Sequence, residues 1–223
     1  MIGIQNEGSL HAALKEFYRE PGDIVEGDVG GYFIDLVQKN RLVEIQTGNF
    51  SSIKRKLSTL LETHEVLLVY PITLRRDIVR IAPETGEILS NRKSPKKGDI
   101  YDLFVELIRI PELILHPRLT VEVAFIKERE IRCDDGRGSW RRRGVSIVDR
   151  TLVGVVERQA FFTASDYLGL LPEDLPCPFS NRDLAQWAKV SRAKAQKTTY
   201  TLKKAGLLEE VGKKGNEILH AVR

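Results

Sequence analysis

Two carboxylates in neighbouring β-type runs are the residues best suited to chemistry in this sequence. The stretch "YFIDLVQKNRLVEIQT", residues 32–47, contains two apolar, β-branched runs joined by the polar "QKNR". Asp35 lies in the first run and Glu44 in the second. Such runs predict a β-hairpin, and a loop centred between residues 39 and 40 pairs positions whose numbers sum to 79. Asp35 and Glu44 are then expected to face each other directly.

A cation is expected between these carboxylates, because like charges directly opposite each other on a sheet are destabilising. Gln46 lies two residues after Glu44 and therefore shares its face. Oxygen ligands of this kind suit Mg²⁺ or Mn²⁺, whereas zinc prefers His and Cys. A metal held there could polarise a phosphoryl oxygen and lower the pKa of a bound water, as phosphodiester hydrolysis requires. The alternative, a solvated sheet face, is disfavoured by apolar neighbours such as Phe33 and Ile45.

The flanking sequence predicts the elements that position this hairpin. Apolar residues at helical spacing predict a helix within residues 6–20. A short strand is expected from about Asp23, and the first hairpin strand runs through Val37. Residues 50–64 carry one apolar helical face, and residues 65–72 form an apolar run typical of a strand buried on both sides. The predicted order is helix, strand, strand, strand, helix, strand.

The segment that follows is predicted to be a β-rich extension. It contains a basic loop, "NRKSPKKG", at residues 91–98, and a helix around residues 99–110. Residues 119–133 and 144–162 have the composition of a long β-hairpin. The tip of that hairpin, "DDGRGSWRRRG", spans residues 134–144.

Composition excludes several classes of protein. With 223 residues, 42% of them hydrophobic and 30% charged, the chain is long enough for one good core or two small ones. It shows no secretory leader and no apolar stretch of membrane-spanning length, so we expect it in the cytoplasm with no membrane partner. Cys133 and Cys177 lack the spacing of a zinc site or disulfide framework. No small-molecule substrate is indicated.

The predicted order, with an acidic residue on the second strand and E-x-Q on the third, resembles the PD-(D/E)XK nuclease superfamily. Its Holliday-junction resolvase-like and Mrr-type restriction endonuclease branches are the most similar. The resemblance covers roughly residues 1–72 and implies an α/β fold with a restriction-endonuclease-like αβββαβ core. It also implies that Asp35 and Glu44 bind Mg²⁺ or Mn²⁺, and that Glu7 on the first helix assists.

The sequence departs from this family at one position, because the family usually has Lys where this chain has Gln46. In some branches the following helix supplies the lysine, and here that helix offers Lys54, Arg55 and Lys56. At 100° per residue, the apolar face centres near Leu57, with Lys54 about 60°, Lys56 about 100° and Arg55 about 160° away. Lys54 is therefore expected to reach the sheet and, with Gln46, to orient the attacking water. Alternatively, its stem only covers the edge of the core.

The C-terminal segment is basic. Residues 176–223 carry ten Lys and Arg against four Asp and Glu, a charge of +6, and the rest of the chain carries −2. Ser180 can cap a helix, residues 192–205 form a second helix that ends at Gly206, and two short strands around "GKKGN" form a wing. This pattern resembles a winged helix-turn-helix domain over about residues 178–223. The helical stretch "TASDYLGLL" before it could complete a three-helix core.

The resemblance implies that the second helix enters a DNA major groove. One face, assigned to the core, carries Ala195, Thr198, Thr199, Leu202 and Ala205. The predicted DNA contacts are Arg192, Gln196, Lys197, Tyr200 and Lys204 on the helix, Lys213 and Lys214 at the wing tip, and Arg141, Arg142 and Arg143 at the other hairpin tip. At that tip Trp140 could stack on an unpaired base. Two alternatives stay open: winged helices also bind proteins, and Asp134 and Asp135 would suit a mixed-charge, solvated turn.

Together these features predict a metal-dependent DNA endonuclease. A nuclease-like domain with a β-rich insertion is expected over residues 1–162, and a winged-helix DNA-binding domain over residues 163–223. The alternative is a non-catalytic DNA-binding regulator that keeps the nuclease-like fold as a scaffold. RNA as the substrate and a homodimer, which cutting both strands would usually require, remain open.

Overall fold

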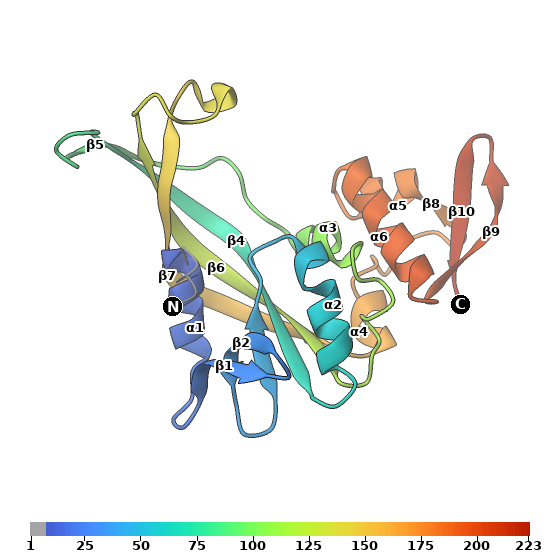
Figure 1. The fold of residues 1–223 in the computed structure, drawn as a ribbon. Helices are drawn as coiled ribbons and strands as arrows, with labels where there is room; N and C mark the ends of the chain where they lie inside the picture. The colour runs from blue at the N-terminus through green and yellow to red at the C-terminus, as the bar shows by residue number, and fades with distance from the viewer. Residues whose placement is uncertain (1–7) are drawn as a thin grey trace. The chain divides into compact units, whose positions relative to one another are not determined.

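The computed structural model describes residues 8–223, which divide into two compact units. One unit contains residues 8–22, 71–99 and 124–158, and the other contains residues 23–70, 100–123 and 159–223. The chain is α/β, and its main sheet is mixed (Figure 1). Within the described residues that sheet has the strand order β1-β2-β3-β4-β6-β7, and β5 pairs with β4 beside this path.

The hairpin carboxylates lie in a three-stranded meander. β1 (Ile24–Val29), β2 (Tyr32–Val37) and β3 (Leu42–Ile45) pair antiparallel in sequence order. The helix α2 (Phe50–Leu60) then leads to β4 (Val66–Ile81), which runs parallel to β3. With α1 (Ser9–Tyr18) before the meander, the predicted order of elements is confirmed.

Burial follows the expected periodicities. Every residue of β3 is buried, as are Phe50, Ile53, Leu57 and Leu60 on one side of α2. The first residues of β4 are buried on both faces, which agrees with their unbroken apolar run. The hydrophobic effect therefore fixes α2 against the sheet through the apolar face that the sequence predicts.

The middle of the chain differs from prediction in one respect. β4 continues to Ile81, and it pairs antiparallel with β5 (Ile88–Lys93), so residues 91–93 of the predicted basic loop belong to a strand. The extension "TLRRDIVRI" contains the β-branched residues Thr73, Ile78, Val79 and Ile81, which favour strands. The expected long hairpin is present as β6 (Leu119–Cys133) and β7 (Ser146–Phe161), with the 3₁₀ turn η2 (Trp140–Arg142) at its tip.

The C-terminal segment forms two helices and a small antiparallel sheet. α5 (Asn181–Trp187) precedes α6 (Arg192–Lys204), and the sheet has the order β8-β10-β9. Its strands are β8 (Phe179–Ser180), β9 (Leu208–Lys214) and β10 (Glu217–Val222). The turn between β9 and β10 is Gly215-Asn216, shorter than the predicted "GKKGN" turn, because pairing extends through Lys214 and Glu217.

Three short helical segments complete the fold. η1 (Ile100–Asp102) and α3 (Leu103–Leu107) contact α6, and α4 (Ala164–Leu168) lies in the stretch predicted to precede the helix pair. Capping boxes start α4 and α5, since Thr163 and Ser180 each exchange hydrogen bonds with an Asp three residues later. Among the helices of residues 8–223, none is long and apolar enough to cross a membrane.

Candidate functional site

The register of the β2–β3 hairpin is the predicted one. Leu36 pairs with Val43 and Val37 with Leu42, so partner numbers sum to 79. Asp35 and Glu44 occupy the next opposed positions, just beyond the last paired residues. There the Asp35 carboxylate accepts a hydrogen bond from the Ile45 backbone N–H, with 2.7 Å between oxygen and nitrogen. The Asp35 side chain thus takes the place of a strand-pairing hydrogen bond to β3 at the point where the β2–β3 ladder ends.

A lysine from α2 lies against the second carboxylate. Lys56 Nζ is 2.6 Å from Glu44 Oε2 and donates another hydrogen bond to the Phe33 carbonyl at 2.5 Å. The pair is well enclosed, because the Lys56 and Glu44 side chains are only 16% and 8% exposed. The cation that the opposed carboxylates require is therefore supplied, at least in part, by the protein itself.

The expectation that Lys54 reaches the hairpin is wrong. Lys54 pairs with Glu112, and both side chains of that pair are about half exposed. Helical spacing correctly put both lysines beside the apolar face, but on opposite sides of it. Which of those sides faces the β2–β3 hairpin depends on how α2 crosses the sheet, and the sequence does not encode that crossing locally.

Gln46 is directed toward the start of α2. Its side-chain amide donates to the Gly48 carbonyl at 2.5 Å, and its backbone N–H bonds to the Val69 carbonyl of β4. Gln46 thus holds the turn between β3 and α2. This contact gives it a positioning role in the loop next to the carboxylates.

A second acidic group, absent from the sequence analysis, lies at the same end of α2. Glu106 accepts a hydrogen bond from the Phe50 backbone N–H at 3.0 Å, which suits a carboxylate at the positive end of a helix dipole. Burial, with the negative charges of Glu106 and Asp102, raises the pKa of Tyr70 to about 12, so this phenol stays protonated at neutral pH. No sequence signal could have linked Glu106 to Phe50, because 56 residues separate them.

The metal-ligand set is incomplete within the described residues. Asp35 and Glu44 are two potential ligands, and residues 8–223 contain no group of three or more His, Cys, Asp or Glu side chains arranged to hold a metal ion. The third expected ligand, Glu7, lies outside the described residues. An ionised carboxylate has about four acceptor positions, so the contacts to Ile45 and Lys56 are compatible with an additional cation.

The helix predicted to contact DNA presents the expected face to solvent. Ala193, Gln196, Tyr200 and Lys204 are exposed, whereas Lys197 is half-buried. The buried residues of α6 are Ala195, Thr198, Thr199, Thr201 and Leu202, which agrees with the assigned core face apart from Thr201 and the half-buried Ala205. The Lys204 ammonium lies 6.0 Å from the Tyr200 ring centroid, which keeps a cation and an aromatic ring together on the exposed face.

Some of the predicted cationic contacts are engaged within the protein. Arg192 pairs with Glu217 at 2.9 Å across to β10. Lys194, which was not among the predicted contacts, pairs with Asp102 of η1 at 2.8 Å and so ties α6 to the segment before α3. Lys213 and Lys214 are exposed at the end of β9, directly before its turn to β10.

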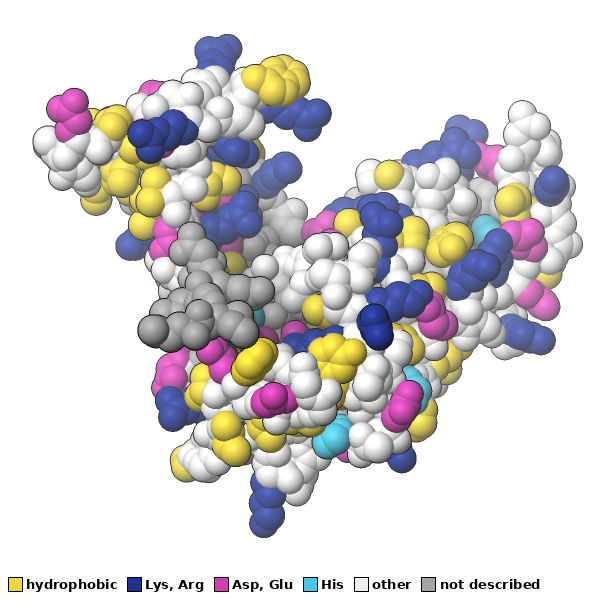
Figure 2. All heavy atoms as spheres, viewed as in Figure 1, with side chains coloured by type: hydrophobic (Ala, Val, Ile, Leu, Met, Phe, Trp, Pro, Cys, Tyr) yellow, Lys and Arg dark blue, Asp and Glu magenta, His cyan; other side chains and the backbone are white. Residues whose placement is uncertain are grey.

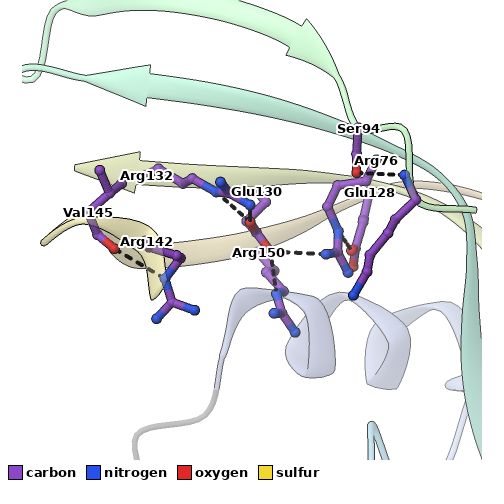
Figure 3. Close-up of polar contacts among 9 residues, drawn as sticks. Arg76, Ser94, Glu128, Glu130, Arg132, Arg142, Val145 and Arg150 are labelled. Atoms are coloured by element: carbon purple, nitrogen blue, oxygen red, sulfur yellow. Dashed lines mark hydrogen bonds and ion pairs between the residues drawn. The ribbon is translucent and has the colours of Figure 1, made fainter. Parts of the chain in front are cut away.

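A buried ion cluster, not foreseen from the sequence, lies in the unit that contains the β6–β7 hairpin tip (Figure 3). Glu130 is fully buried and contacts Arg132 at 2.6 Å, Arg150 at 3.1 Å and Arg76 at 3.3 Å. Arg76 also pairs with the buried Glu128. The sequence could have indicated this cluster through "KEREIR", where Glu128 and Glu130 lie two residues apart and therefore on one face of a strand.

The electrostatics of this cluster favour the ionised carboxylate. Burial by itself raises the pKa of Glu130, but the hydrogen bond from Arg132 and the charges of Arg76 and Arg150 outweigh it and lower the pKa below the usual value. The cluster joins β4, β6 and β7 close to where the hairpin tip begins (Figure 3). Both of its buried carboxylates have arginine partners, so the cluster supports the fold next to the tip.

Comparison with known proteins relates this arrangement to a family. Residues 8–162 match the family model described as "Domain of unknown function (DUF8091)". The chain belongs to this DUF8091 family. The hairpin carboxylates, Lys56 and the Glu130 cluster lie within the DUF8091 domain, whereas α5, α6 and the β8-β10-β9 sheet follow it.

One relative extends the similarity beyond the DUF8091 domain. A protein of Treponema pallidum (strain Nichols), described as uncharacterized, is 34% identical over 186 residues, covering 83% of this chain and 74% of the relative. An alignment of that length must reach past residue 162, because only seven residues precede the family match. No solved structure matches the chain.

Proposed function

We propose that this DUF8091 protein is a metal-dependent DNA endonuclease with a restriction-endonuclease-like core and a C-terminal winged helix. The observation that carries the proposal is the pair of opposed carboxylates at the point where the β2–β3 ladder ends. Asp35 and Glu44 occupy positions in the confirmed register, and a lysine of the following helix contacts Glu44 at 2.6 Å. Two acidic residues suit a metal ion and a lysine suits developing charge on a phosphate, and metal-assisted phosphodiester hydrolysis can use both.

In this proposal Asp35 and Glu44 would hold Mg²⁺ or Mn²⁺. The ion would supply a more acidic bound water and charge compensation at the phosphoryl oxygens. Lys56 takes the part first expected of Lys54. Its ammonium would orient the attacking water or offset negative charge that develops on the phosphate. Gln46 would hold the β3–α2 turn through its bond to the Gly48 carbonyl.

DNA would be bound by the exposed face of α6 and by the wing. Gln196, Tyr200 and Lys204 project from one helical face and suit contacts to base edges and phosphates in a major groove. Lys213 and Lys214 lie beside the wing turn and suit contacts to the backbone. The net charge of +6 over residues 176–223 supports a polyanionic partner.

The Lys56–Glu44 pair also favours a second candidate, a non-catalytic DNA-binding regulator. An ammonium already neutralises one of the two carboxylates, as it would in a protein that uses them only to hold its scaffold together. Both candidates predict DNA binding through residues 163–223. They differ in whether Asp35 and Glu44 bind a metal ion.

A cleavage assay tests the proposal. Purified protein is incubated with Mg²⁺ or Mn²⁺ and single-stranded, duplex, flapped and four-way-junction DNA, beside Asp35→Asn and Glu44→Gln variants of confirmed fold. Cutting by the wild type that both substitutions abolish is the expected result. Binding to duplex without cutting of any substrate would reject the nuclease and favour the regulator.

A further inference from the structure

The tip of the β6–β7 hairpin presents a tryptophan to solvent. Trp140 is 83% exposed and begins the turn η2. In Figure 2 dark-blue Lys and Arg side chains flank an exposed hydrophobic side chain at the end of this hairpin. An exposed aromatic among cations is the arrangement by which proteins stack an unpaired nucleobase and hold its phosphates.

The turn that carries Trp140 is closely packed. The Gly138 N–H donates to the Gly144 carbonyl at 2.8 Å, and the Arg142 N–H donates to the Ser139 carbonyl at 2.9 Å. A Cβ atom on Gly138 would lie only 1.9 Å from the Val145 carbonyl oxygen, so the two arms touch through backbone. Trp140 is therefore held by a built turn, which lowers the conformational entropy lost when a ligand binds.

The acidic residues of the tip are directed into internal contacts. Asp134 pairs with Arg80 at 2.6 Å. Asp135 accepts hydrogen bonds from the Arg137 N–H and the Ser146 hydroxyl, and the first of these is the main reason its pKa is lowered. Both carboxylates therefore have defined partners in the fold, and the Asp134–Arg80 pair is about half exposed.

The tip is rich in arginine, and one arginine contacts the ring. Residues 137–143 carry four Arg and no Asp or Glu. The Arg141 guanidinium lies 5.6 Å from the Trp140 ring centroid, and Arg142 donates from Nε to the Val145 carbonyl. The first contact places a cation over the indole, and the second fixes the Arg142 guanidinium against the Val145 carbonyl.

We infer that Trp140 is a stacking site for an unpaired nucleobase, with the neighbouring arginines on the adjacent phosphates. The inference rests on the proposed DNA function and adds a substrate class, DNA that contains unpaired nucleotides. A base within an uninterrupted duplex has both faces covered by its neighbours, so Trp140 can stack on it only where the duplex is opened, gapped or ended.

Tryptophan fluorescence provides a direct test, because the chain has two tryptophans, Trp140 and Trp187. The Trp187→Phe variant leaves Trp140 as the reporter, and Trp140→Phe is the matched control. Each is titrated, with EDTA present, with a gapped DNA and with an uninterrupted duplex of the same length. We expect quenching of the Trp140 reporter by gapped DNA but not by duplex, and no such difference in the control.

Affinity gives an independent measurement. Trp140→Ala should weaken binding of gapped DNA by about 5- to 150-fold, the range for loss of one base–aromatic stack, and leave duplex binding unchanged. Equal effects on both DNAs, or an unquenched reporter, would overturn the inference while leaving DNA binding intact. If a gapped RNA titrated in parallel quenches the Trp140 reporter and gapped DNA does not, the assignment to DNA is overturned. If the wild type binds neither DNA, the proposed function fails as well.

Discussion

Replacing Lys56 by methionine tests the central contact of the candidate site. Methionine keeps an unbranched apolar stem but removes the ammonium that contacts Glu44 at 2.6 Å and the Phe33 carbonyl. The Glu44 side chain is 8% exposed, so its carboxylate would lose the Lys56 ammonium in a nearly dry environment. Breaking such a buried pair typically destabilises by about 3–5 kcal/mol. Lys56 is itself slightly exposed, which favours the lower end, about 3 kcal/mol.

Lys54→Met is the matched control on the same helix. Its partner is Glu112, and both side chains are about half exposed, so the pair should contribute about 0–1 kcal/mol. For a protein of this size, each kcal/mol shifts the melting temperature by roughly 2–4 °C. We therefore expect a fall of about 6–12 °C for Lys56→Met and at most about 4 °C for Lys54→Met, measured by circular dichroism at neutral pH.

A double variant distinguishes the loss of the Lys56–Glu44 ion pair from the loss of side-chain packing. Adding Glu44→Gln to Lys56→Met removes the buried carboxylate charge that Lys56 contacts, so the double variant should be more stable than the sum of the single changes predicts. Equal melting temperatures for Lys56→Met and Lys54→Met, or strict additivity in the double variant, would refute the buried ion pair. In the cleavage assay, Lys56→Met should be inactive and Lys54→Met active.

Three further predictions concern the metal, the ion cluster and the DNA-binding helix. Mg²⁺ should raise the melting temperature of the wild type but not of Asp35→Asn, because a ligand that binds only the native state stabilises it; an equal rise in both would place the metal elsewhere. The folded pKa of Glu130 is lowered below its usual 4.5, so its stabilisation is complete above that value and lost as pH falls through the folded pKa. Between pH 7 and pH 3 the melting temperature should therefore fall less steeply for Glu130→Gln than for the wild type. An equal fall in both proteins would contradict this. Lys204→Ala should weaken duplex binding and reduce the slope of log K against log salt by about 1, the value for one phosphate contact, whereas an unchanged slope in salt titrations would exclude that contact.

The sequence by itself determined the local elements and the faces that they present. The centre of the "QKNR" loop set the register, because antiparallel partners have a constant sum, and Leu36 does pair with Val43. Helical periodicity identified the buried face of α2 and the exposed face of α6. Ser180 was correctly identified as a helix cap, because its hydroxyl bonds to the Asp183 N–H within the same turn. Each of these depends on residues only a few positions apart.

Only the tertiary structure decided which charged groups meet. Lys54 and Lys56 flank the same apolar face, and the crossing of α2 over the sheet directs Lys56 to Glu44 and Lys54 to Glu112. The Glu130 cluster likewise joins Arg76 to a carboxylate 54 positions away. Periodicity assigns a side chain to a face, but an ion pair needs two faces brought together by the packing of the whole core. Such partners therefore follow from the fold and not from the spacing of residues along the chain.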